Sequence, residues 1–208
     1  AYGELLLQNK RGSVVAIEPG TGEILALLTS PTYDPGLLVG RERTKNYRKL
    51  QFDESKPLYN RAIQGRYNPP GSTFKIVNAL IGLQEGVITT KTSLPCNGGY
   101  RVGSFHQACH HGGSINFTLS ISGSCNDYYS QVFMRIFRYN KFDSISHAYA
   151  NWRKHLLTFG IGRRLGTDLS HESKGTIYTK EFYDKRYKGK EWRPLQFVSM
   201  AIGQGEVG

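Results

Sequence analysis

The sequence contains one stretch on which the interpretation of the whole chain depends, Arg66-Tyr67-Asn68-Pro69-Pro70-Gly71-Ser72-Thr73-Phe74-Lys75. Its two prolines and its glycine predict a stiff, extended turn. An apolar run follows over residues 76–83, and Gly86 comes shortly after it. This order is typical of a buried helix that stops at a glycine. The stretch therefore predicts a turn that leads directly into a helix of the core.

Two residues of this stretch carry the chemistry. Ser72 and Lys75 are three positions apart, so they share one face of the expected helix. Apolar neighbours should lower the pKa of the Lys75 ammonium, and a neutral amine beside a hydroxyl is a general base beside a nucleophile. The Ser72 N–H at the helix N-terminus would be one donor of an oxyanion hole. A helix-capping serine and a surface lysine remain the alternative.

Three further motifs stand around this one. Residues 14–26 read Val-Val-Ala-Ile-Glu-Pro-Gly-Thr-Gly-Glu-Ile-Leu-Ala, Ser124-Cys125-Asn126 lies downstream, and Ala201-Ile202-Gly203-Gln204-Gly205-Glu206 lies near the end. In this order they resemble the conserved set of the penicillin-binding proteins, in which S-x-x-K is followed by S-x-N and K-T-G. The resemblance covers most of the chain. It is strongest to the class B, monofunctional type, the penicillin-binding protein 2 group of cell elongation.

The resemblance implies an α/β fold of the penicillin-binding protein and serine β-lactamase type, with a largely antiparallel sheet and helices on both sides. It implies a D,D-transpeptidase in which Ser72 is acylated, Lys75 is its base, Ser124 relays a proton and Asn126 holds the substrate amide. No Lys-Thr-Gly or Lys-Ser-Gly follows Gly205. We therefore expect a transpeptidase domain that is incomplete at its C-terminus, lacks the second oxyanion donor and has a low or absent catalytic efficiency as a fragment.

Two other functions stay open. A serine β-lactamase or a β-lactam sensor would share the fold, and the lactamase would need a positioned water that no residue of the sequence identifies. A binding domain that keeps the fold without turnover is the alternative outside enzymes. No cofactor is required for acyl transfer by a serine and a lysine.

Composition restricts the setting. The net charge is +11 in 208 residues, with no nucleic-acid-binding motif, which leaves an anionic substrate, an anionic membrane surface or a solvated basic surface. Nucleic acid is not expected. The resemblance implies stem peptides and lipid-linked precursors as substrates, β-lactams as inhibitors and a membrane-embedded elongation glycosyltransferase as partner. It also implies a bacterial inner-membrane protein whose domain faces the periplasm, with the anchor outside this chain.

Cysteine and histidine gather between residues 89 and 113, where they include Cys96, His106, Cys109, His110 and His111. We expect a structural zinc bound by Cys96, Cys109, His111 and Cys125, with His106 or His110 as substitutes. A Cys96–Cys109 disulfide and plain buried thiols are the alternatives.

Periodicity gives the remaining elements. Residues 1–12 read as the end of a linker, and residues 13–208 as the transpeptidase domain, with a loop-rich insertion at 89–113. The continuous apolar runs of residues 13–28 predict a hairpin buried on both faces. Four-residue spacing predicts helices near 126–137 and 145–159. Residues 176–193 mix aromatic and basic side chains, which we interpret as aromatics packed on the domain with the charges in water.

Overall fold

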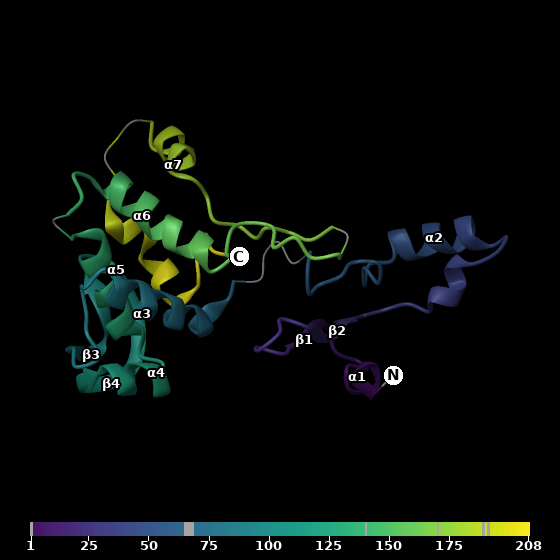
Figure 1. Cartoon of the computed structure of the whole chain (residues 1–208), viewed down its shortest axis with the longest axis horizontal. Coiled ribbons are helices and arrows are strands. Elements are labelled where there is room, and N and C mark those ends of the chain that lie inside the picture. Colours follow the sequence, from purple (N-terminus) through teal and green to yellow (C-terminus); the bar gives the residue numbers. More distant parts are fainter. Residues whose placement is uncertain (1, 65–68, 140, 170, 189, 191) are drawn as a thin grey trace. The chain divides into compact units, whose positions relative to one another are not determined.

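The computed structural model describes residues 2–64, 69–139, 141–169, 171–188, 190 and 192–208. Gly65, Arg66, Tyr67 and Asn68, which precede the serine in the central motif, lie outside these residues. The chain forms two compact units, residues 1–65 with 166–173 and residues 66–165 with 174–208. Figure 1 shows the strands as two hairpins, β1–β2 and β3–β4, with helical segments before and after each of them.

The first unit is built around a hairpin. Strands β1 (Gly12–Ile17) and β2 (Ile24–Ser30) pair antiparallel, with Gly12 opposite Ser30. The short helix α1 (Tyr2–Leu6) precedes them, and the 3₁₀ turn η1 (Pro35–Leu38) and the exposed helix α2 (Arg43–Phe52) follow. The Arg61 guanidinium donates hydrogen bonds to three backbone carbonyls of the segment before it, those of Ser55, Lys56 and Tyr59.

The hairpin itself was predicted correctly, but its burial was not. Val14 and Val15 are each 45% exposed and Leu25 is 66% exposed. The two strands pair only with each other among the described residues. A strand that is buried on both faces needs neighbours on both faces, and the described residues of this unit cover these side chains only in part.

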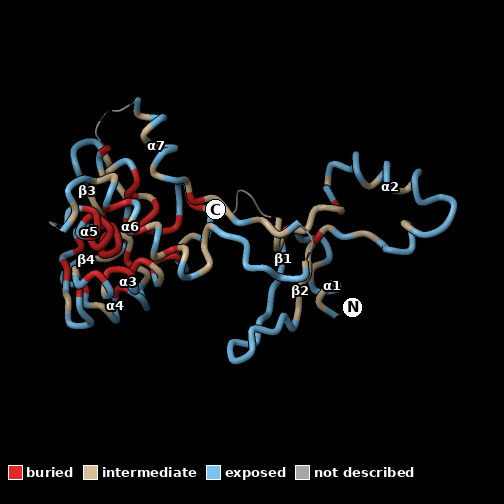
Figure 2. The backbone as a smooth tube through the Cα atoms, turned by 45° about the horizontal axis from the view of Figure 1, so that its top comes forward, coloured by how far each residue is buried: buried red, intermediate tan, exposed pale blue. Residues whose placement is uncertain are grey.

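The second unit has helix α5 (Asn126–Phe137) at its centre. Helices α3 (Phe74–Gln84) and α6 (Ile145–Thr158), strands β3 (Ser93–Val102) and β4 (Phe105–Asn116) and the 3₁₀ segment η3 (Pro194–Ile202) all contact it. The buried backbone in Figure 2 is concentrated on these elements. This burial explains the four-residue spacing, because six apolar and aromatic residues of α5 are at most 1% exposed: Tyr128, Tyr129, Val132, Phe133, Ile136 and Phe137.

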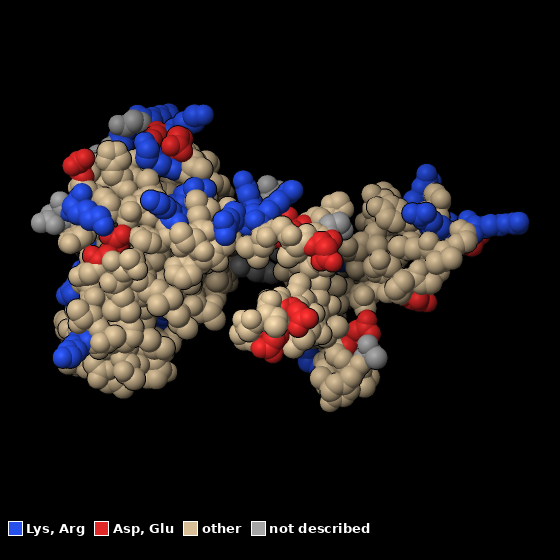
Figure 3. Space-filling model, in the orientation of Figure 1, with Lys and Arg blue, Asp and Glu red and all other residues tan. Residues whose placement is uncertain are grey.

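Aromatic rings fill the core between α5 and α6. Trp152 makes edge or tilted contacts with Phe74, Phe133, Phe137 and Tyr149. Helix α7 (Lys180–Arg186) adds Tyr183, which is fully buried against Tyr149. Tyr183 and Trp192 therefore pack inward as expected, whereas Phe182 is 37% exposed. Figure 3 shows Lys and Arg side chains in separate groups on the face drawn, with Asp and Glu near several of them, and no continuous basic patch.

The segment expected to be loop-rich is instead a long hairpin. Strands β3 and β4 pair antiparallel from Ser93 with Asn116 to Val102 with Phe105, with an irregularity between Asn97 and Gly99. Gly99 has φ +138°, and a side chain there would collide with the backbone of Gln107. The glycines that suggested loops therefore form a bulge inside the hairpin.

Candidate active site

The central motif forms the expected turn and helix. The 3₁₀ turn η2 (Gly71–Thr73) runs directly into α3, and Gly86, with φ +71°, follows the C-cap residue Glu85. Ser72 is exposed, whereas Lys75 is only 3% exposed. The first turn of one helix thus presents a hydroxyl to solvent and carries an amine into the interior.

The Lys75 amine is held by the second motif, which starts 49 residues later in the chain. Its Nζ donates hydrogen bonds to the Ser124 carbonyl (2.7 Å), the Ser124 Oγ (2.9 Å) and the Asn126 Oδ1 (2.6 Å). Ser124 has φ +55°, a conformation that costs free energy for a residue with a side chain. In this conformation both its carbonyl and its hydroxyl reach the amine. The structure therefore brings Lys75, Ser124 and Asn126 together, and it places Ser72 one helical turn before Lys75.

The environment of Lys75 changes its acidity. Burial lowers the pKa of the ammonium below its ordinary value, while the nearby Cys109 and Cys125 thiol groups act in the opposite direction. The net direction matches the expectation from its apolar neighbours. A larger fraction of the amine is therefore neutral at a given pH than for a lysine in water.

Asn126 connects Lys75 to the hairpin. Its Oδ1 accepts from the amine, and its Nδ2 donates to the carbonyl of Ala108 on β4 at 2.8 Å. Both ends of the amide are thus fixed, which also determines its orientation. The N-cap of α5 is not Asn126, since the Cys125 sulfur accepts the Tyr128 N–H.

The last motif, residues 201–206, contacts the turn Gly71–Thr73 that carries Ser72. Gly203 has φ +66°, and its carbonyl accepts the Gly71 N–H at 2.9 Å. A Cβ at this position would lie 2.2 Å from the Gly71 carbonyl oxygen. Only glycine allows this approach, so the backbone of this motif contacts the turn that carries Ser72.

Asn78 has a structural role in this region that the sequence analysis did not predict. It is fully buried, its Nδ2 donates to the carbonyls of Met200 and Ala201, and its Oδ1 accepts the Trp152 indole N–H. It thereby joins α3 to α6 and η3 one turn beyond Lys75. An asparagine within an apolar helix was the available signal, because a buried amide requires partners.

Glu85, at the end of α3, has a similar role. It accepts from Lys141 (2.5 Å), His155 (2.6 Å) and Asn151 (2.7 Å). Burial alone would raise the pKa of its carboxyl, but these hydrogen bonds lower it to about 2. The carboxylate fixes the C-terminal end of α3 to α6.

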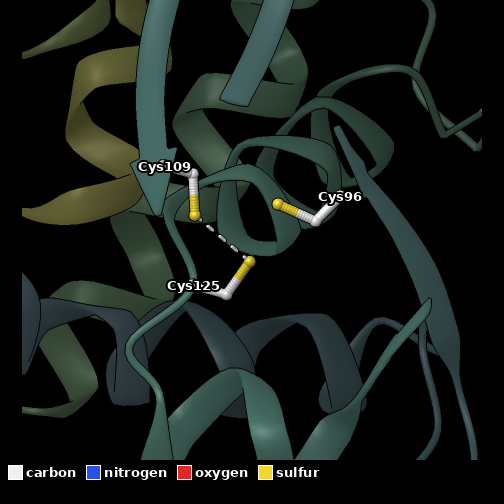
Figure 4. A group of neighbouring side chains, drawn as sticks. All are labelled: Cys96, Cys109 and Cys125. Carbon is white, nitrogen blue, oxygen red and sulfur yellow. Dashed lines mark hydrogen bonds between the residues drawn. The ribbon is translucent and has the colours of Figure 1, made fainter. Parts of the chain in front are cut away.

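The three cysteines form a cluster behind Lys75. The sulfur atoms of Cys96, Cys109 and Cys125 all lie within 4.8 Å of one another, and all three residues are buried. Figure 4 shows the thiols directed toward one another from two strands of the hairpin and the turn before α5. Burial raises the pKa of Cys125 and raises that of Cys96 to about 12. Burial would do the same to Cys109, but hydrogen bonds from Asp127, His111 and Cys125 lower its pKa to about 6.

Of the three clustered histidines, one reaches the cysteines. His111 Nδ1 lies 3.2 Å from the Cys109 sulfur. The group of candidate ligands found among the described residues consists of the three cysteines, so the exposed His106 and His110 and the half-buried His111 all lie outside it. The structure thus brings together Cys96, Cys109 and Cys125, with His111 beside Cys109, and it contains no disulfide among them.

A serine one turn before a buried lysine, with a second serine and an asparagine on the amine, is the arrangement that the S-x-x-K and S-x-N motifs of the penicillin-binding type lead one to expect. Residues 12–205 match the model of the penicillin binding protein transpeptidase domain, and the chain belongs to this family. It is 35% identical over 205 residues to the peptidoglycan D,D-transpeptidase MrdA of Acinetobacter baumannii. That match covers 96% of this chain and 28% of the length of the relative.

Solved structures give the same result. The chain is similar to PBP2 of Pseudomonas aeruginosa in complex with WCK 5153, at 30% identity and a TM-score of 0.80, over 98% of this chain and 44% of that one. It is also similar to PBP2 of Helicobacter pylori in complex with MreC, at 28% identity and a TM-score of 0.81, over 99% of this chain and 36% of that one. The class B, PBP2-type resemblance and the fold class are therefore confirmed.

Proposed function

We propose that this chain is the acyl-transfer domain of a peptidoglycan D,D-transpeptidase that cross-links stem peptides during cell elongation. The observation that carries the proposal is the Lys75 amine, buried and hydrogen-bonded to Ser124 and Asn126, one helical turn after the exposed Ser72. The homology to MrdA supports the same activity.

Ser72, Lys75 and Ser124 have different roles in the proposed reaction. A neutral Lys75 removes the Ser72 proton as the hydroxyl oxygen attacks the carbonyl of the penultimate D-alanine. The Ser72 N–H, in the first turn of the helix, stabilises the oxyanion. After taking the Ser72 proton, Lys75 donates to the Ser124 carbonyl, to Asn126 and to the Ser124 hydroxyl, and it can return the proton through that hydroxyl. That hydroxyl can then pass a proton to the leaving D-alanine amine. A neighbouring stem amine releases the acyl group as a cross-link.

Mass spectrometry after incubation with a penicillin tests the proposal. We expect one covalent equivalent on the protein, lost slowly, and none on Ser72→Ala, because the β-lactam acylates the same hydroxyl. Ser122→Ala removes an exposed hydroxyl outside the site and is expected to keep the adduct. Rapid loss of the adduct would instead identify a β-lactamase, and its absence from the full-length protein would leave a binding domain without turnover.

We further propose a structural zinc at Cys96, Cys109, His111 and Cys125. Tetrahedral thiolate ligands about 2.3 Å from zinc lie about 3.8 Å apart. The Cys109 and Cys125 sulfurs are 3.6 Å apart, and all three sulfurs lie within 4.8 Å, which fits this donor set. The lowered pKa of Cys109 also favours the thiolate that a metal requires. A metal here would tie the hairpin to the Ser124 turn and would take no part in the acyl transfer.

Elemental analysis tests the zinc. We expect about one equivalent per chain in the purified protein, and a lower melting temperature after chelation, because a ligand of the folded state stabilises it. Cys125→Ser should lose the metal, whereas His110→Ala, which changes an exposed histidine outside the cluster, should keep it. A content below about a tenth of an equivalent would exclude the site.

Partners and location are also proposals. The described residues include no helix that is both long and apolar enough to cross a bilayer. We propose an inner-membrane protein with this domain in the periplasm and a membrane-embedded elongation glycosyltransferase as its partner. The support is the homology to MrdA and to a PBP2 solved with MreC. Pull-down of the full-length protein with a co-expressed, membrane-embedded elongation glycosyltransferase would test the pairing.

A further inference from the structure

A surface pocket of about 640 Å³ is formed in the second unit by the last turns of α5 and by β3, which pack against each other (Figure 1). Its volume is in the range of sites that hold a small molecule or a few residues of a peptide. The apolar part of the lining includes Met134, which is 4% exposed, and the half-buried Val87. Tyr100 of β3 and Tyr139, which follows α5, add two aromatic rings.

The charged side chains that line the pocket are both arginines. Arg135 and Arg138 are exposed and lie three positions apart at the end of α5, so they share one side of it. Neither guanidinium takes part in a hydrogen bond or an ion pair within the part of the chain that the structure describes. The acidic residue of this helix, Asp127, is 4% exposed, and its carboxylate accepts from the Asn97 N–H and the Gln131 amide. The pocket therefore carries positive charge without a neutralising carboxylate in its lining.

Gln131 gives the pocket a fixed polar group. Its Nε2 donates to the Pro95 carbonyl at 2.7 Å and to the Asp127 Oδ1 at 2.9 Å, so both amide hydrogens are engaged. Its Oε1 has no hydrogen-bond partner among the described residues. This oxygen is thus held in position and can accept an N–H group from a ligand.

We propose that this pocket binds an acidic peptide segment of a partner protein. An apolar side chain of the segment lies on Met134 between the two tyrosines, its carboxylates pair with Arg135 and Arg138, and a backbone N–H donates to Gln131. Tyrosine, methionine and arginine are enriched at protein interfaces, and tyrosine and arginine supply many of the residues that dominate binding. Charge complementarity selects an acidic segment, because a carboxylate and a guanidinium can form two parallel hydrogen bonds.

The lining favours a peptide over other anionic partners. Cations near a helix C-terminus stabilise the helix dipole, but this role needs no aromatic and apolar pocket beside them. Membranes and nucleic acids are bound through clusters of many basic residues, whereas two arginines line this pocket. A segment that combines a large apolar side chain with carboxylates matches both parts of the lining.

The pocket and the active site lie at opposite ends of α5. Asn126, which binds the Lys75 amine, is the first residue of the helix, and Arg135 follows nine positions later (126 to 135). At 1.5 Å per residue this separation is about 14 Å along the helix. A peptide in the pocket therefore leaves the Lys75 amine and its partners untouched.

The experiment uses the full-length protein and a phage-displayed library of random dodecapeptides. The library is first depleted on the double variant Arg135→Glu/Arg138→Glu, in which the charge of the pocket is reversed, and is then selected on the wild type. We expect enriched sequences that place acidic residues beside an aromatic or large aliphatic residue. The most enriched peptide is synthesised and titrated into each protein by calorimetry.

Single variants locate the binding. Arg135→Gln and Arg138→Gln should each weaken the peptide by about tenfold, because each removes a charged hydrogen-bond donor. Tyr139→Ser should weaken it by about fivefold without changing the charge. Arg163→Glu reverses an exposed arginine of the same unit outside the pocket and should leave the affinity unchanged.

The outcome does not depend on the proposed acyl transfer, since circular dichroism checks the fold of each variant and no penicillin is needed. If no acidic peptide is enriched that requires Arg135 and Arg138, the proposal is wrong. Equal affinity of Tyr139→Ser and the wild type would reduce the binding to unspecific charge attraction and would also overturn it. Calorimetry with glycerol 1-phosphate tests the other occupant, because binding of this head group in place of any acidic peptide would assign the pocket to a lipid.

Discussion

Lys75→Met is expected to slow acylation by penicillin by about 10²–10⁴-fold, the contribution of a positioned general base. Methionine is unbranched like lysine and tolerates a buried site, but it cannot accept the Ser72 proton. Asn126 retains its hydrogen bond to Ala108 in the variant, so the surrounding turn should persist. Single-turnover acylation followed by intact mass measures the rate, and circular dichroism checks the fold.

The matched control is Lys91→Met, which makes the same chemical change at an exposed position of the same unit. It should leave the rate unchanged. A wild-type rate in Lys75→Met would show that another group deprotonates Ser72.

The pH dependence follows from the direction of the Lys75 pKa shift. Burial lowers this pKa, so the neutral, reactive amine accumulates at a lower pH than for a lysine in water. The acylation rate should rise as the pH increases through the lowered pKa and level off above it. In Lys75→Met this rise should disappear, which separates the loss of a base from a change in packing.

Much of this site could be predicted from sequence because its residues belong to short motifs. Ser72 and Lys75 share one helical turn, so their spacing alone places them together. Ser124 and Asn126 were assigned through the resemblance, since periodicity cannot show that the turn before α5 reaches α3. The hydrogen bonds of Lys75 depend on the left-handed conformation of Ser124, which no local pattern indicates.

The failures have physical causes. Residues 89–113 were expected to form a loop-rich insertion, yet Leu94, Cys96, Cys109 and Ile115 are buried in the core as part of a hairpin. The cysteines supply part of its apolar face, which obscured the two-residue period. In the first unit the prediction overestimated burial instead of underestimating it. Apolar strands were expected to be buried, whereas burial depends on neighbours and not on the strands alone.

Asn78 shows most clearly what a sequence leaves open, and its replacement gives the second large effect. Asn78→Leu should lower the free energy of unfolding by roughly 2–4 kcal/mol, because buried donors and acceptors left without partners cost about 1–3 kcal/mol each. The Trp152 N–H and the Ala201 carbonyl lose the amide, and both lie where water does not reach easily. Urea unfolding monitored by tryptophan fluorescence measures the loss.

A double-mutant cycle with Trp152→Phe separates the parts of this effect. Trp152→Phe removes the indole N–H, so Asn78→Leu in that background should cost less than in the wild type, by about the free energy of one hydrogen bond, 1 kcal/mol. The rest of the loss then comes from the two carbonyls of η3. Since η3 leads to Gly203 beneath the Ser72 turn, the variant should also acylate more slowly under conditions where it remains folded. Full acylation in a folded Asn78→Leu protein would show that the position of η3 is set without this amide.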